Sequence, residues 1–188
     1  MKSHILLGAG GHAKSLVEAI TAGGGKICAY VDPKVCSWIN CQHVLDERQI
    51  EPEDGVLVIG LGGISPAKLS VRLELLNSMI ARGFEAPPVV HPAAYVSANA
   101  SLAPGTVILA GAVVQPGVVL GTGVIINSGA IVEHDSTVGA GSHIAPGAII
   151  LGNCKIGTHC FVGAGTVVVQ EKKVTNGSLI PALHKFSG

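Results

Sequence analysis

The chain has 188 residues, enough for one large domain or two small ones, and its 12 basic and 12 acidic side chains cancel to a formal net charge of zero. This balance, without any cluster of lysine and arginine, excludes the electrostatic footprint of a nucleic-acid-binding protein. No run approaches 18 uninterrupted apolar residues and the glycine-rich start is unlike a signal peptide, so we expect a soluble cytoplasmic protein without membrane insertion.

Residues 1–85 hold 17 of the 24 charged residues and alternate strand-like with helix-like runs. The runs HILLGAG, KICAYVD and GVLVIGLGG predict three strands, and HAKSLVEAI is compatible with a helix. A second, amphipathic helix opens at Pro66 and closes at Gly83. This β-α-β-β-α order predicts a small parallel α/β domain, and Ala86-Pro87-Pro88 marks its end.

A glycine loop lies between the first strand and the first helix. Gly8-Ala9-Gly10-Gly11-His12-Ala13 reads G-x-G-x-x-A, a pattern in which backbone N–H groups approach a phosphate at a helix N-terminus. Asp32 ends the next strand, where its carboxylate can accept hydrogen bonds from a ribose or a base. A domain this short fits one nucleoside diphosphate better than a complete dinucleotide. The alternative is a tight strand–helix turn that binds nothing.

The second half of the chain is a repeat of six residues. Starting at Val90 and stepping by six, all sixteen positions as far as Ile180 are aliphatic. Four residues after most of them stands a small or β-branched residue, and the position before that is most often glycine. This pattern predicts short flat strands with one large and one small inward residue each, glycines at the corners, and coils stacked at roughly 4.8 Å.

The cysteines have a structural interpretation. Cys154 and Cys160 fall on the small inward position and are expected to fill the core. The five cysteines include no CxxC pair, and their odd number suggests free thiols. Cys36, Cys41 and His43 match no standard zinc spacing, so no metal is expected.

One histidine stands out because charge is almost absent around it. Between residues 86 and 170 the only charged residues are Glu133, Asp135 and Lys155. His134 follows the inward Val132 by two positions, at neither core position, and should project outward. A histidine beside a carboxylate suits acyl transfer, which needs a base to take the proton of the attacking amine or hydroxyl. The alternative is a surface histidine with two solubilising acids.

The hexapeptide pattern resembles the left-handed β-helix of the hexapeptide acyltransferases. Together with G-A-G-G-H-A-K, the proline hinge, H-P-A-A-Y-V-S and the E-H-D triplet, the chain resembles the NeuD/PglD-like family of bacterial sugar O- and N-acetyltransferases. The resemblance implies a Rossmann-like α/β subdomain over 1–85, a left-handed parallel β-helix of about five coils over 86–188, and acetyl-CoA as co-substrate. It also implies homotrimers with active sites in the grooves between prisms, and a role in glycan biosynthesis.

The resemblance assigns roles to individual residues. It places the general base at His134, with Asp135 as its partner and Glu133 as a weaker candidate for that partnership. The residues that match positions contacting acetyl-CoA in the family are His143, Gly152 and Ala164. The residues that match its nucleotide-holding positions are Gly8, Gly10, Gly11, His12 and Asp32, and the glycine run that includes Gly62 is expected to border the same cleft.

These features favour N-acetylation of a nucleotide-linked amino sugar of the UDP-4-amino-sugar type. We expect direct attack in a ternary complex, because no cysteine or serine is both outward and paired with a base, as an acyl-enzyme route requires. One alternative is O-acetylation of sialic acid or a related sugar. Another is a non-catalytic nucleotide-sugar-binding protein, because the segment Pro181–Lys185 matches the closing segment of the family only loosely and the C-terminus is shortened relative to it.

Overall fold

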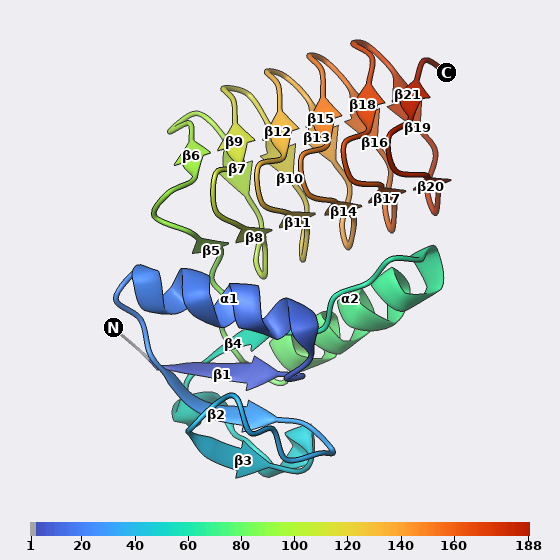
Figure 1. Ribbon diagram of the computed structural model, residues 1–188. Coiled ribbons are helices and arrows are strands. Elements are labelled where there is room, and N and C mark those ends of the chain that lie inside the picture. The colour runs from blue at the N-terminus through green and yellow to red at the C-terminus, as the bar shows by residue number, and fades with distance from the viewer. Residues whose placement is uncertain (1–2) are drawn as a thin grey trace.

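A computed structural model describes residues 3–188, in which a small α/β unit leads into a triangular β-helix (Figure 1). The α/β unit consists of β1 (His4–Leu7), α1 (Gly11–Ala22), β2 (Ile27–Val31), β3 (Gln42–Val44), β4 (Val56–Ile59) and α2 (Pro66–Ala81), with 3-10 turns at Glu47–Gln49 and Pro52–Asp54. Its parallel strands are ordered β3-β2-β1-β4. The three expected strands are present, and β3 is an addition that the sequence did not reveal, since only Val44 of its three residues is buried.

The two helices cover opposite faces of this sheet. Leu16 of α1 belongs to the cluster around Leu6 and Val58, whereas Leu76 of α2 belongs to the cluster around Leu57. Strand order reverses between β1 and β4, because β1 leads to β2 on one side and β4 lies on the other. In open parallel sheets the crevice at such a switch point, beyond the carboxyl ends of the strands, is the usual ligand site.

The remaining strands have two residues each and form the three faces of a prism. Face 1 contains β5 (Val89–Val90), β8 (Val107–Ile108), β11 (Ile125–Ile126), β14 (His143–Ile144), β17 (Phe161–Val162) and β20 (Leu179–Ile180). Face 2 contains β6 (Tyr95–Val96), β9 (Val113–Val114), β12 (Ile131–Val132), β15 (Ile149–Ile150), β18 (Val167–Val168) and β21 (Lys185–Phe186). Face 3 contains β7 (Ser101–Leu102), β10 (Val119–Leu120), β13 (Thr137–Val138), β16 (Lys155–Ile156) and β19 (Lys173–Val174). The expected left-handed parallel β-helix is confirmed.

The interior of the prism follows the six-residue pattern. Thirteen of the sixteen aliphatic positions, from Ile108 to Ile180, are buried in one continuous core. The first three are less covered, and Val90 is 37% exposed, because no coil stacks beneath them. Cys154 and Cys160 are fully buried, free thiols that fill the small inward position as expected. The corner glycines have φ between 65° and 74°, as at Gly129 and Gly117, which is the left-handed backbone that the turn requires.

The α/β unit lies against face 1 of the prism, with β4 as the nearest strand and β3 as the farthest (Figure 1). Helix α1 contacts β5, and the cluster around Leu16 continues into Val107 and Ile125 of the prism. Helix α2 reaches the edge between faces 3 and 1, where an added Cβ on Gly105 or Gly123 would meet Leu76. In a triangular prism the edge between faces 2 and 3, which we call edge 2–3, lies opposite face 1 and hence away from the α/β unit.

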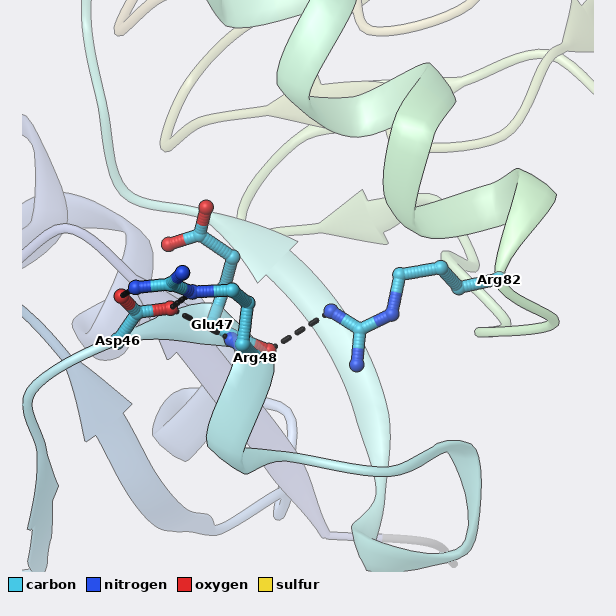
Figure 2. A network of polar contacts seen from close by, with 4 residues as sticks. All are labelled: Asp46, Glu47, Arg48 and Arg82. Atoms are coloured by element: carbon cyan, nitrogen blue, oxygen red, sulfur yellow. Dashed lines mark hydrogen bonds and ion pairs between the residues drawn. The ribbon is translucent and has the colours of Figure 1, made fainter.

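Polar contacts secure the far end of α2. The guanidinium of Arg82 donates from Nη1 to the carbonyl of Glu47 (2.8 Å, Figure 2) and from Nη2 to that of Ile50 (2.7 Å). Arg48 pairs with Asp46 in the same turn. The loop after β3 is therefore attached to the C-terminal end of α2. Within residues 3–188, no helix has the length and apolarity needed to cross a membrane.

Candidate active site

Two side chains on edge 2–3 form an acid–base pair. The Nδ1–H of His134 donates a hydrogen bond to Oδ2 of Asp135 over 2.9 Å, and these side chains are 62% and 68% exposed. Since a carboxylate only accepts, the proton of the neutral imidazole is on Nδ1 and the lone pair of Nε2 is free. His134 projects outward, as its register predicted, and presents a base at the surface.

Asp135 holds a backbone conformation that most corners of the prism give to glycine, although Asn153, His159, Glu171 and Leu183 also adopt it. Its φ is 60°, and the residues one hexad away on either side, Gly129 and Gly141, have φ of 65° and 70°. The left-handed region costs an L-residue about 1 kcal/mol, somewhat less for aspartate. The turn itself does not need a carboxylate at this position.

A cavity of about 450 Å³ opens beside the imidazole, lined by Glu133, His134, Leu151, Gly152, Asn153, Gln170 and Glu171. A Cβ added to Gly152 would lie 2.8 Å from Nε2 of His134, so a glycine is needed here to leave that nitrogen accessible. Glu133 lines the same cavity, but Nδ1 of His134 bonds to Asp135 instead.

The glycine loop occupies the switch point between β1 and β4. Gly8 has φ of 85°, and an added Cβ there would clash with the side chain of Leu61 in the loop after β4. Around Gly10 and Gly11, by contrast, no atom lies within 4 Å of an added Cβ. The loop is therefore packed on one side and open on the other, at the N-terminus of α1, where backbone N–H groups favour an anion.

Asp32 holds the glycine loop from the end of β2. Its Oδ2 accepts a hydrogen bond from the N–H of Ala9 (2.9 Å) and its Oδ1 one from the N–H of Lys34 (3.0 Å). Trp38, which the sequence did not single out, donates from Nε1 to the carbonyl of Ala9 (3.0 Å). Each carboxylate oxygen has a second lone pair, so Asp32 keeps acceptor capacity for a ligand.

His143 lies buried between the prism and the α/β unit. Its Nδ1–H donates to the carbonyl of Gly63 (2.8 Å) and its Nε2 accepts from the amide of Asn127 (2.9 Å), while Phe161 contacts the ring edge-on. Burial lowers the pKa of His143, so the neutral ring is favoured. The sequence did not single out Asn127, because an amide in a corner turn carries no distinguishing pattern.

His12 lies at the start of α1, with its ring 6.3 Å from that of His143. Burial, with smaller contributions from the charges of Arg72 and His143, lowers the pKa of His12 to about 4. An added Cβ on Gly62 would lie 3.1 Å from the Cβ of His12, so the two glycine-rich loops touch here. His12, His143 and the loop after β4 therefore lie close together beside the glycine loop.

The residues assigned to acetyl-CoA do not gather in one place within the chain. Gly152 lies beside His134 on edge 2–3, His143 lies in β14 on face 1, and Ala164 lies in the turn between β17 on face 1 and β18 on face 2. His134 on edge 2–3 and the glycine loop at face 1 are on opposite sides of the prism. No group of three or more potential metal ligands occurs among residues 3–188.

Comparisons with known proteins agree with this arrangement of elements. The family described as "Bacterial transferase hexapeptide (six repeats)" matches residues 135–170. A search of curated protein sequences finds no match.

Several solved structures are similar over almost the whole chain. The acetyltransferase domain of PglB from Neisseria gonorrhoeae FA1090 is 33% identical, with a TM-score of 0.86 over 94% of this chain and 87% of that one. The same domain in complex with acetyl coenzyme A is 31% identical, with a TM-score of 0.85 over 95% and 92%. PerB from Caulobacter crescentus, in complex with CoA and GDP-perosamine, is 25% identical, with a TM-score of 0.69 over 92% and 91%.

Proposed function

Since the chain belongs to the hexapeptide-repeat family of bacterial sugar acetyltransferases, we propose that it moves an acetyl group from acetyl-CoA to the amino group of a nucleotide-linked amino sugar. The observation that carries this proposal is the pair of His134 and Asp135, with Nε2 free beside an open cavity. The ligands of the similar structures, acetyl coenzyme A in one and GDP-perosamine with CoA in another, support the two substrate classes.

In the proposed reaction the sugar amine attacks the thioester carbonyl directly. A C–N bond forms, the C–S bond breaks, and Nε2 of His134 takes the proton that the amine loses. Asp135, bonded to Nδ1–H, keeps the ring in this tautomer and stabilises the imidazolium. The same proton then neutralises the departing CoA thiolate, which returns His134 to its starting state.

We also propose that one active site draws on two chains of a homotrimer. Within one chain His134 is on edge 2–3, whereas the glycine loop and His143 lie at face 1 on the opposite side of the prism. A sugar held in the crevice of one protomer would meet the base of its neighbour. Mixed trimers of His134→Ala and an inactive glycine-loop variant, Gly10→Trp, should then recover part of the activity that each variant lacks alone.

The test is CoA release with UDP- and GDP-linked 4-amino sugars. We expect His134→Ala to lower kcat by about 10²- to 10⁴-fold, the usual contribution of a general base. His159→Ala is the matched control, since His159 lies in a turn between face 3 and face 1, away from edge 2–3. Comparable rates for His134→Ala and wild type would remove His134 from the mechanism.

A further inference from the structure

Arg72 is a buried arginine without a counter-charge. It is 1% exposed in α2, and its Nη1 donates to the carbonyl of Gly123 in the prism. Its Nε and Nη2 have no hydrogen-bond partner. Arg82, near the C-terminal end of the same helix, is different, because both of its terminal nitrogens donate to carbonyls, one of them shown in Figure 2. Arg72 is thus the arginine whose polar groups the fold leaves unmatched.

The charge of Arg72 persists at neutral pH. Burial lowers its pKa to about 10, which still leaves the guanidinium protonated. Among residues 3–188 no carboxylate forms an ion pair with Arg72 or with Lys68, one turn earlier in the same helix. An uncompensated buried charge costs several kcal/mol, so a missing anion would explain why this side chain is an arginine.

A cavity of about 340 Å³ adjoins Arg72 at the carboxyl end of β4, lined by Leu61, Gly62, Ala67, Lys68, Val71 and Arg72. It lies along the first two turns of α2, where the unpaired backbone N–H groups carry a partial positive charge. Ser65, the N-cap residue, makes no side-chain hydrogen bond to those groups. The cavity is therefore lined by two cationic residues and adjoins the first two turns of α2.

The same cavity adjoins the glycine loop, where the nucleotide is proposed to bind. Gly62 is one of its lining residues and also lies against His12, whose Nε2 is buried without a partner. The charge of Arg72 contributes to the depressed pKa of His12, which places the two side chains in one electrostatic environment. His12 and Arg72, each with unmatched polar atoms, thus both adjoin Gly62 in the loop that follows β4.

We propose that this cavity, with Arg72 and Lys68 as its cations, binds an anionic group of the acceptor substrate. The inference rests on the proposed function and adds to it the chemistry that selects the acceptor. Guanidinium and ammonium groups recognise phosphate and carboxylate oxygens alike. The anion is therefore either the diphosphate of a nucleotide-linked sugar or the carboxylate of an acidic sugar.

Calorimetry without acetyl-CoA tests this binding separately from acetyl transfer. The titrants are UDP, GDP and N-acetylneuraminic acid, and the variants are Lys68→Ala, Arg72→Met and, as the matched control, Lys172→Ala in the prism. We expect Lys68→Ala to weaken binding by about 3- to 10-fold and Arg72→Met by at least tenfold, with Lys172→Ala unchanged. If the variants bind UDP or GDP more weakly than wild type does, the anion recognised by the cavity is a diphosphate. If they bind N-acetylneuraminic acid more weakly, the anion is a carboxylate.

Thermal unfolding separates binding from a structural role. Apolar replacements of unmatched buried charges are often neutral or stabilising, so Arg72→Met without ligand should melt no lower than wild type. If Arg72→Met does not fold, Lys68→Ala alone decides, because Lys68 is exposed. Unchanged affinity for every titrant in the folded variants would overturn the inference. The proposed function would be overturned by a separate result, namely a rate of CoA release in His134→Ala that equals the wild-type rate.

Discussion

Asp135 accepts a hydrogen bond from His134 over 2.9 Å while its own backbone has φ of 60°, at a position where the neighbouring hexads have glycine. The pair that carries the proposed chemistry is thus held at a small cost to the turn. This relationship makes stability and activity separable by mutation.

Replacing Asp135 by glycine should raise the stability of the protein while lowering its activity. Relief of the left-handed strain, about 1 kcal/mol, should raise Tm by about 2–4 °C for a chain of this size. Without the carboxylate the imidazolium loses its partner, so kcat should fall by about tenfold or more. Calorimetric unfolding and CoA release measure the two effects. Asp135→Asn, which also tolerates this backbone, should lower kcat without raising Tm; a variant Asp135→Gly that keeps full activity would refute the role of the carboxylate.

Adding one methyl group at Gly152 should block the base. The new Cβ would lie 2.8 Å from Nε2 of His134, closer than atoms normally approach. His134 is largely exposed and can turn away, so the fold should be unaffected while the base leaves its position. We expect Gly152→Ala to lower kcat by about 10²-fold, with Tm within 1 or 2 °C of wild type. A normal kcat would show that Nε2 is not where the proton is taken.

Acid should destabilise the protein through His12. Its pKa is lowered from 6.5 to about 4 in the folded state, so the unfolded chain takes up a proton first as the pH falls. The stability that the neutral ring provides is complete above pH 6.5 and is lost progressively down to about pH 4. The buried His143, whose pKa is also lowered, acts in the same direction. Tm measured from pH 7 to pH 4 should drop, and His12→Gln should make that drop shallower.

The thiol of Cys154 should be replaceable by the hydroxyl that other coils use. Cys154 donates from Sγ to the carbonyl of Val169, and Ser136, one coil earlier, donates from Oγ to that of Leu151. We therefore expect Cys154→Ser to change the free energy of unfolding by less than about 1 kcal/mol. Cys154→Leu inserts a larger side chain into a fully buried site and should cost about 1–3 kcal/mol. Urea unfolding of the two variants provides the comparison.

The period of six predicted the prism well, including the inward residues, the corner glycines and the outward direction of His134. Strand β3 was not predicted, since three residues with one buried side chain resemble a loop. Asn127 and Trp38 were missed for a related reason: a single polar or aromatic residue in a turn has no periodic signal.

The sequence by itself determined the β-helix, the α/β unit before it and the candidate base, because these depend on contacts between a coil and the next or on runs within one element. Only the tertiary structure decided which residues of the α/β unit contact the prism. The bonds from His143 to Gly63 and from Arg72 to Gly123 join residues 80 and 51 positions apart. Such contacts depend on how α2 and the loop after β4 dock on face 1 and its edge, and no local period encodes that docking.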